Sequence, residues 1–200
     1  MGGTKTTLRA QTREHFISVA RELFAEAGYQ MTTMNEIARR ARKSRRTLYT
    51  YFSTKEEVYM EVIQQELRHL YEELVAFVNR PMDPMEKMLQ YAARREVAVS
   101  KIVKWNGSLE AEFFKDFGNV ERARIRFDVL ERDLIAKILR EGMEKGAFKC
   151  LDLKRTTYLL HAAMKGLEVP FIRGQFGRKE EAIQETYNIV RILLLEGLKK

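Results

Sequence analysis

The sequence predicts an all-α protein, with a small amino-terminal group of three helices followed by a longer helical part. Apolar residues recur three and four positions apart over most of the chain, and no segment alternates apolar and polar residues with period two. Three prolines and eleven glycines in 200 residues leave little turn material, which favours long helices. A chain of this length can bury a core of its own in one or two domains.

The first predicted helix spans residues 7–27, and Gly28 supplies a C-terminal stop. Its apolar stripe consists of Phe16, Ile17, Ala20, Leu23, Phe24 and Ala27. Thr33 begins the sequence TMNE, a Thr-x-x-Glu capping box that predicts a short helix from Met34 to Ala41. After a basic turn, Ser44 is placed to cap a second short helix, which carries Leu48 and Phe52 into the core.

Longer helices are predicted in the rest of the chain. The sequence STKEE at residues 53–57 starts a helix that runs to about Asn79, before Pro81 and Pro84 end it. Further apolar patterns with helical spacing cover residues 120–145, 155–172 and 179–198.

Two short helices joined by a tight turn, behind a longer helix, form the helix-turn-helix layout. In that layout the N-terminal residues of the second short helix reach base edges in the major groove of DNA. Positive charge is concentrated here, since residues 1–50 hold ten Lys or Arg against four Asp or Glu, a net +6 of the chain's +8. This asymmetry favours a polyanionic partner for the amino-terminal part.

The sequence therefore predicts a DNA-contacting set around the second short helix. Arg45, Arg46 and Thr47 are expected to touch base edges, because the forked guanidinium suits guanine. Ser44 belongs to the same N-terminus. The residues expected to hold phosphates lie at helix N-termini and on outer faces; they are Thr33, Tyr49, Tyr51 and Lys55.

The sequence TTMNEIARRARKSRRTLYTYFSTKEEVY resembles the DNA-binding signature of the TetR family of transcriptional repressors, and ISVARELFAEAGYQMTT resembles the family's first helix. The resemblance covers about residues 10–65. The chain departs from the family at the turn, where Arg42 and Lys43 replace the usual Gly and small apolar residue. We interpret this pair as extra phosphate-binding charge.

The resemblance implies about nine helices in two domains: a helix-turn-helix DNA-binding domain at residues 1–53, with the motif at about 33–52, and a ligand-binding and dimerisation domain at residues 54–200. The helices at 155–172 and 179–198 have more apolar surface than one core-facing stripe, which favours a four-helix interface with a second copy. The alternative is that they are central helices of a monomer. The expected interface residues are Leu160, Leu167, Ile183, Tyr187, Val190 and Leu194.

A group of mostly aromatic residues in the second part is a candidate lining for an effector cavity. These residues are Tyr91, Trp105, Phe113, Phe127, His161 and Met164. For each of them, ordinary packing in the core is the alternative.

Other classes of site find no support in the sequence. The chain lacks phosphate-loop, dinucleotide and G-x-S-x-G motifs, so we expect no enzymatic activity and no cofactor. The histidines at 15, 69 and 161 show no metal-ligand spacing with carboxylates or with the single cysteine, Cys150, so no metal site is predicted. The lack of an apolar segment of membrane-spanning length or of a signal peptide predicts a cytoplasmic protein without a membrane partner.

Together with the charge and helix patterns, the resemblance implies a regulator that binds a palindromic double-stranded DNA operator as a homodimer and is released by an unknown small-molecule effector. Repression rather than activation is implied only by the family resemblance. The alternative is a helical protein that coats nucleic acid without sequence preference or effector control. A regulator should prefer one site over bulk DNA by roughly 10³-fold or more, whereas a coating protein should not.

Overall fold

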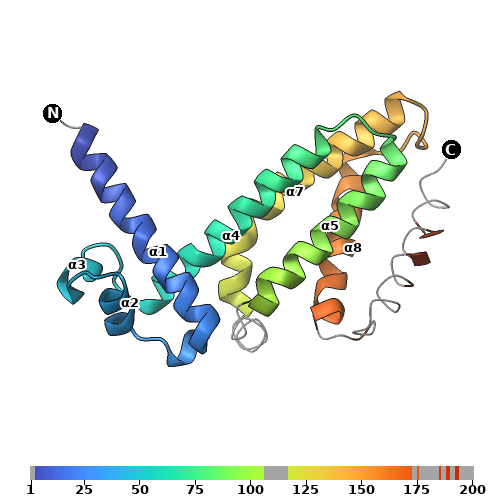
Figure 1. Cartoon of the computed structure of the whole chain (residues 1–200). Helices are drawn as coiled ribbons and strands as arrows, with labels where there is room; N and C mark the ends of the chain where they lie inside the picture. Colours follow the sequence, from blue (N-terminus) through green and yellow to red (C-terminus); the bar gives the residue numbers. More distant parts are fainter. Residues whose placement is uncertain are drawn as a thin grey trace. The chain divides into compact units, whose positions relative to one another are not determined.

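The computed structural model describes residues 3–105 and 117–172, together with positions 175, 185, 188, 189, 192 and 193. All the regular elements in these residues are helices, which confirms the all-α class (Figure 1). The helices are α1 (Gly3–Met31), α2 (Met34–Arg40), α3 (Arg45–Tyr49), α4 (Lys55–Val78), α5 (Pro84–Trp105), α7 (Phe117–Glu144) and α8 (Leu153–Ile172). The total of about nine helices stays a prediction, because the helix expected at 179–198 lies outside the residues described in continuous segments.

Helix α1 extends beyond its predicted bounds at both ends. It starts at Gly3 and is assigned to Met31, but Gly28 leaves helical geometry at φ 80° and ψ 162°. Glycine alone adopts this region without a steric penalty, so the predicted stop is present as a break inside the element. The Gly28 carbonyl then accepts hydrogen bonds from Thr32 N at 3.2 Å and Thr32 Oγ1 at 2.8 Å, which closes the turn before α2.

Helix α5 was not predicted as a separate element, because Pro84 was interpreted only as the end of the preceding helix. In the structure Pro84 is the first residue of α5, where its missing N–H costs no hydrogen bond. Asp83 caps this start, since its Oδ1 accepts from Met85 N at 2.9 Å and Glu86 N at 3.1 Å. Within the described residues, no helix is both long and apolar enough to cross a membrane.

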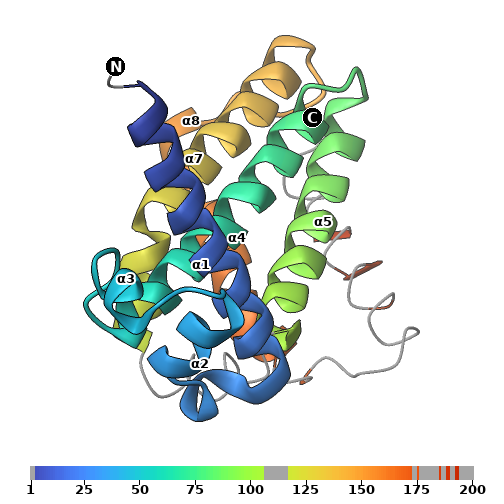
Figure 2. The ribbon, with the colours of Figure 1, turned by 60° about the vertical axis from the view of Figure 1, so that its left-hand side comes forward.

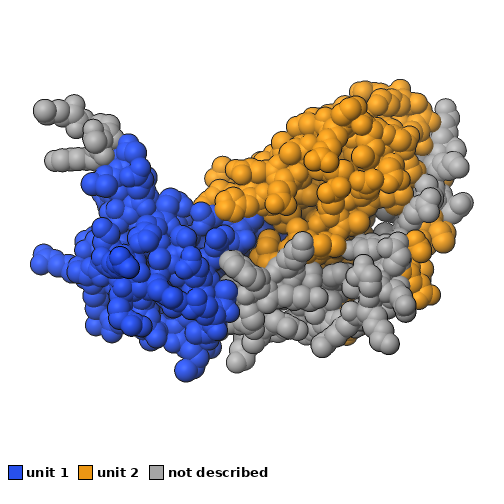
Figure 3. All heavy atoms as spheres, in the orientation of Figure 1, with its two compact units in different colours: residues 1–67, 103–124 blue, residues 68–102, 125–200 orange. Residues whose placement is uncertain are grey.

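The chain divides into two compact units, residues 1–67 with 103–124 and residues 68–102 with 125–200 (Figure 3). Helix α4 contributes residues to both. This division differs from the predicted boundary between residues 53 and 54 because Val58, Val62 and Ile63 of α4 are buried in the first unit. The predicted boundary stays a prediction about where the DNA-binding function ends.

In the first unit, α2 packs against both α1 and α3 (Figure 2). The most deeply buried apolar side chains of the first unit include Phe16, Ile17, Ala20, Phe24, Ile37, Leu48, Phe52, Val58 and Val62. Most of the apolar positions that the sequence pattern assigned to the core of this unit are thus confirmed, including Leu48 and Phe52. The pattern was wrong at Ala27, which is exposed just before the break at Gly28, and Leu23 is only half-buried.

The second unit is built from the end of α4 and from α5, α7 and α8. Lys87 of α5 donates to Glu141 of α7 at 2.7 Å, and Lys165 of α8 donates to Asp128 of α7 at 2.8 Å. Its buried apolar side chains include Leu74, Phe77, Met88, Tyr91, Phe127, Ile135, Ile138, Leu139 and Met164.

Candidate functional site

The N-terminus of α2 has the predicted capping box. Thr33 Oγ1 accepts from Glu36 N at 3.2 Å, and Thr33 N donates to Glu36 Oε2 at 2.8 Å. The side-chain hydrogen bond from Thr33, followed by its backbone hydrogen bond, lowers the pKa of Glu36 below its usual value. Two amide groups that the first turn would leave unpaired are therefore satisfied, which explains why so short a helix begins at a defined residue.

The turn between α2 and α3 forms a Schellman motif. Lys43 N donates to Ala38 O at 3.0 Å and Arg42 N donates to Arg39 O at 3.1 Å, after the C-cap residue Ala41. Arg42 occupies the position that favours glycine and has φ 53°, the one positive φ of a non-glycine residue in the described part of the chain. Arg42 thus adopts the left-handed conformation at the position where the family usually has glycine. Because arginine has a Cβ, this conformation is strained.

Helix α3 begins at Ser44, as the sequence predicted. Ser44 Oγ accepts from Thr47 N at 3.0 Å and lies 2.8 Å from Thr47 Oγ1. Leu48 is fully buried, whereas Arg45 and Arg46 on the first turn are exposed. The cap and the buried leucine therefore anchor α3 with its basic N-terminus facing solvent.

Basic side chains around this turn lack acidic partners. In the part of the chain that the structure describes, Arg42, Lys43, Arg45 and Arg46 are exposed and form no ion pair with a carboxylate. Nearby Arg40 differs, because it pairs with Glu26 of α1. The charge that the sequence concentrates here is thus left available to an external anion.

The aromatic residues after this turn have different environments. Tyr49 is 42% exposed, and the Arg45 guanidinium lies over its ring with Cζ 5.4 Å from the ring centroid. Tyr51 is half-buried, with its ring centroid 5.7 Å from that of Phe16, and Arg9 lies over it at 5.9 Å. Arg9, which was not among the predicted DNA-contacting residues, adds a cation beside Tyr51.

Lys55 is engaged within the protein. Its Nζ donates to Tyr29 O at 2.7 Å and to Gln30 O at 3.3 Å, and it lies 4.2 Å from the centroid of the Tyr29 ring. A cation at the C-terminal end of a helix stabilises it by pairing with its last carbonyl groups. The phosphate contact expected for Lys55 stays a prediction, and the structure adds this second role.

The second unit contains a buried ionic cluster that the sequence analysis missed. Arg95 of α5 is 0% exposed, and its guanidinium donates to Glu131 of α7, to Glu168 of α8 and, at 3.1 Å, to the neighbouring Glu96. Tyr91 also donates to Glu131 Oε1 at 3.3 Å. The cluster therefore links three helices through charge-assisted hydrogen bonds between buried side chains.

The pKa values of two carboxyl groups in this cluster are shifted in opposite directions. Burial raises the pKa of Glu131, but the charge of Arg95 and the hydrogen bonds to Glu131 more than offset this and lower it to about 2. Burial raises the pKa of Glu96 to about 7, because its weaker contact with Arg95 does not offset the desolvation and the nearby charges of Glu168 and Glu131. Burial lowers the pKa of Arg95, but its carboxylate partners outweigh that effect and leave it raised.

Several residues predicted to line the cavity lie beside this cluster. Tyr91, Phe127, His161 and Met164 are all buried in the second unit, and His161 Nε2 lies 3.1 Å from Glu131 Oε2. The side chain of Trp105 and the whole of Phe113 lie outside the described residues. A cleft of about 610 Å³ between α4 and α5 and another of about 780 Å³ between α7 and α8 are lined by other residues. The effector role of the predicted set stays a prediction.

A signal in the sequence could have revealed the cluster. Each charged residue lies four positions from a buried apolar or aromatic residue on the same helix face: Arg95 follows Tyr91, Glu131 follows Phe127 and Glu168 follows Met164. A charged residue within an apolar stripe is a candidate for a buried, paired charge.

The outer face of α8 exposes apolar and small side chains. Tyr158 is 62% exposed and Leu159 is 60% exposed, whereas the predicted interface residues Leu160 and Leu167 are half-buried. The other predicted interface residues, Ile183, Tyr187, Val190 and Leu194, lie outside the described residues. The sequence analysis did not include Tyr158 and Leu159 among the interface residues.

The helix-turn-helix segment matches a known protein family. Residues 16–62 match the family described as bacterial regulatory proteins, tetR family. The HTH-type transcriptional regulator YhgD of Bacillus subtilis is 23% identical over 149 residues, which are 72% of this chain and 75% of that protein. AcrR of Shigella flexneri, also an HTH-type transcriptional regulator, is 25% identical over 203 residues, 96% of this chain and 94% of that protein.

Solved structures share this fold over most of the chain. A transcriptional regulator from Cytophaga hutchinsonii superposes with a TM-score of 0.77 at 24% identity, covering 94% of this chain and 98% of that one. The matched family segment contains the capped helices and the exposed cations of the helix-turn-helix. The family match at residues 16–62, the related regulators and the shared fold together support a TetR family transcriptional regulator.

Proposed function

We propose that this chain is a repressor that binds a palindromic DNA operator as a homodimer and leaves it when a small molecule binds. The observation that carries the DNA-binding proposal is the group of exposed cations, Arg42, Lys43, Arg45 and Arg46, without carboxylate partners in the described residues. They surround the N-terminus of a helix held in place by Ser44, and a helix N-terminus favours anions.

Within this surface we assign two kinds of contact. Arg45, Arg46 and Thr47 lie on the first turn of α3 and are proposed to read base edges. Arg42, Lys43 and the capping residues Thr33 and Ser44 are proposed to hold phosphates, as are Tyr49 and Tyr51. Base contacts supply preference for one sequence, whereas phosphate contacts add affinity for every sequence.

The test is selection of bound DNA from a random library, followed by binding measurements on two variants. Arg46→Ala should cost about 1–3 kcal/mol on the selected site and relax preference at one base pair. Lys43→Ala, the matched control, should weaken selected and random DNA alike and lower the salt dependence by about one counterion. Equal losses on both DNAs for Arg46→Ala would instead support sequence-independent coating.

Lys55 requires a separate comparison because its Nζ already bonds two carbonyl groups. Lys55→Ala should lower the melting temperature if its role is to cap α1. If Lys55 also holds a phosphate, the variant should additionally weaken all DNA sequences alike after folding is verified. Circular dichroism and binding to random DNA separate the two roles.

The proposal of a homodimer is supported by the exposed apolar face of α8. Leu159→Glu introduces charge at a residue that is 60% exposed in a single chain, so its folding cost is small. In a dimer that uses this face, sedimentation should change from dimer to monomer. Ile125→Glu on α7, where the side chain is 64% exposed, is the matched control and should leave the assembly unchanged.

Release by an effector is supported by the family match and by the separate second unit, which contains Tyr91, Phe127, His161 and Met164. If the effector and operator oppose each other, the operator must weaken effector binding by the same factor by which the effector weakens operator binding. A coupling of about 1–3 kcal/mol is typical. Effector affinity measured with and without operator tests this, and equal affinities would exclude the mechanism.

A further inference from the structure

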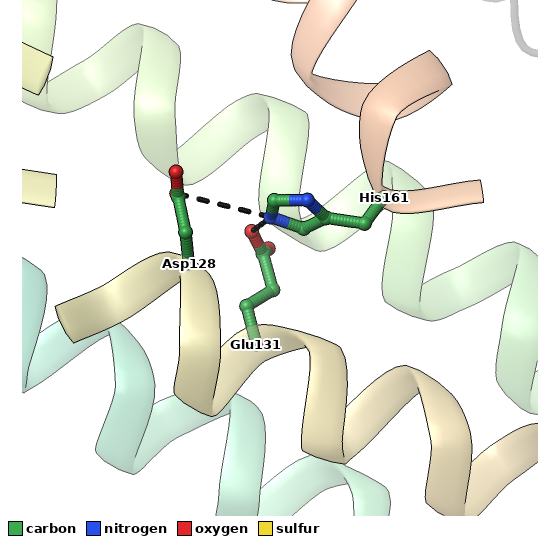
Figure 4. Close-up of side chains that lie close together, drawn as sticks. All are labelled: Asp128, Glu131 and His161. Carbon is green, nitrogen blue, oxygen red and sulfur yellow. Dashed lines mark ion pairs between the residues drawn. The ribbon is translucent and has the colours of Figure 1, made fainter. Parts of the chain in front are cut away.

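Three metal-ligating side chains converge in the second unit. Asp128 and Glu131 lie three residues apart on α7, and both face His161 of α8 (Figure 4). His161 Nε2 is 3.1 Å from Glu131 Oε2 and 3.8 Å from Asp128 Oδ1, and one ligand atom from each residue lies within 4.8 Å of the others. All three residues are buried. The sequence spacing did not indicate this group because His161 is 30 positions from Glu131 along the chain.

These separations suit a single bound ion. Metal–nitrogen and metal–oxygen bonds of about 2.0–2.2 Å place two ligands of one ion about 3 to 4 Å apart for bond angles of about 90° to 130°. The two measured separations fall in this range without any change of rotamer. The ligand atoms of Asp128 and Glu131 lie within 4.8 Å of each other, so a small rotation of a carboxylate is enough for the three residues to reach one ion.

The imidazole nitrogen is not satisfied by a hydrogen bond. His161 is 4% exposed, and its Nε2 forms no hydrogen bond in the described structure although Glu131 Oε2 is 3.1 Å away. The distance between Nε2 and Oε2 suits a hydrogen bond, but the orientation of the two groups does not. The carboxylate oxygens are acceptors, so Nε2 meets them favourably only if it carries a hydrogen or if a cation lies between the atoms. A proton on Nε2 would favour a well-aligned hydrogen bond, whereas an ion between the atoms would not require one.

The remaining carboxylate oxygens are held by other side chains. Lys165 Nζ donates to Asp128 Oδ2 at 2.8 Å, and Glu131 Oε1 accepts from Arg95 Nε and from Tyr91 OH. Glu131 Oε2 also accepts from Arg95 Nη2 at 3.2 Å and has a second lone pair available for an ion. Such outer contacts orient ligating carboxylates at metal sites.

The two carboxylates of the site favour a cation. Asp128 and Glu131 are both buried, and each has an oxygen close to His161 Nε2. Two buried carboxylates close together are costly unless cations of the protein, a proton or a metal ion offset their charge.

We propose that Asp128, Glu131 and His161 bind one divalent first-row transition-metal ion per chain. One imidazole and two carboxylates suit Zn²⁺, Mn²⁺, Fe²⁺, Co²⁺ or Ni²⁺, whereas Mg²⁺ and Ca²⁺ prefer ligands that are all oxygen. Three protein ligands leave at least one coordination position for water or for an oxygen of a bound small molecule. The inference concerns the second unit alone and does not depend on DNA binding.

The test uses the full chain with Cys150→Ser as the background, because Cys150 is exposed and could ligate metal on its own. After treatment with a chelator and dialysis, titration with Co²⁺ and Zn²⁺ should give one ion per chain with micromolar or tighter affinity. Co²⁺ should show visible bands of a nitrogen–oxygen site and no sulfur charge-transfer band. Mg²⁺ should not compete.

Two variants assign the ligands. His161→Gln and Asp128→Asn should each weaken binding at least about 100-fold, whereas His69→Gln, which alters an exposed histidine on α4, should not. Circular dichroism verifies that each variant is folded, and Asp128→His, which restores a ligand, should recover most of the affinity. Absence of a stoichiometric ion in the folded background protein, or retention of the ion by folded His161→Gln, overturns the assignment.

Discussion

The two units place their charged residues in opposite ways. The first unit holds Arg42, Lys43, Arg45 and Arg46 at its surface without acidic partners in the described residues. The second unit buries Arg95 completely and surrounds it with three carboxylates. Charges exposed to solvent cost little free energy of folding, even when they have no partner in the protein. Buried charges lose their hydration and must therefore be paired within the protein.

The difference predicts that the charged residues of the first unit contribute to DNA binding and those of the second unit to stability. Removing a cation from the first unit should change DNA affinity and leave the free energy of unfolding nearly unchanged. Removing one from the second unit should first change stability, because its partners stay buried and unpaired. Parallel measurements of stability and DNA binding on the same variants test this comparison.

The largest effect should come from Arg95→Leu. It leaves Glu131, Glu168 and Glu96 buried without their shared guanidinium, and breaking such a cluster costs about 3–5 kcal/mol. Urea denaturation monitored by circular dichroism measures the loss. Arg46→Ala is the counterpart in the first unit and should change the free energy of unfolding by less than about 0.5 kcal/mol. Similar losses for the two variants would contradict the comparison.

The two units also differ in how far the sequence predicted them. The caps at Thr33 and Ser44 and the buried Leu48 and Phe52 were predicted because local hydrogen bonds and one apolar stripe determine them. The ionic cluster was missed because its members come from three helices, and their pairing depends on how those helices pack. Only the placement of Arg95 and Glu131 within apolar stripes hinted at burial.

Glu96→Gln should change how stability depends on pH. The folded-state pKa of about 7 lies above the ordinary value of 4.5, so the folded state binds more protons between these values. The contribution of Glu96 is therefore most favourable below about pH 4.5 and is lost as the pH rises to 7, by up to about 3 kcal/mol. Glu131 acts in the opposite sense below pH 4.5, since its pKa is about 2.

Denaturation at pH 5 and pH 8 measures this effect outside the range of Glu131. Wild-type protein should lose stability from pH 5 to pH 8 through Glu96, and Glu96→Gln should remove most of that loss while keeping an acceptor for Arg95. Glu86→Gln, which alters an exposed carboxylate at the start of the same helix, should behave as wild type. An unchanged pH dependence in Glu96→Gln would show that Glu96 is not the group that titrates.

A smaller effect should follow from Thr33→Ala in the first unit. The substitution removes the hydroxyl that accepts from Glu36 N, and the loss of an N-cap costs about 1 kcal/mol. Thr33→Ser keeps the cap and should stay close to wild type. Thermal melts measure stability, and DNA binding at a temperature where both variants are folded separates capping from the proposed phosphate contact. A stable Thr33→Ala protein would show that the cap contributes little.

Arg42→Gly should produce the smallest change in stability. Unlike Arg95→Leu and Thr33→Ala, it should stabilise the protein. Arg42 has φ 53°, which strains a residue with a Cβ, and glycine removes that strain. Glycine also has a more flexible unfolded state, so the net gain should be only about 0.5–1 kcal/mol. Lys43→Gly is the matched control, because Lys43 has no positive φ and the variant should lose stability.

Arg42→Gly should also weaken DNA binding. This measurement distinguishes a strained arginine that contacts DNA from one that only strains the turn. Arg42 is exposed beside the N-terminus of α3 and has no carboxylate partner in the described chain. If it holds a phosphate, Arg42→Gly should bind every DNA sequence less tightly and reduce the salt dependence by about one counterion. A variant that is both more stable and equally tight on DNA would show that the arginine at this turn has no part in the interface, and the basic surface would then consist of Lys43, Arg45 and Arg46.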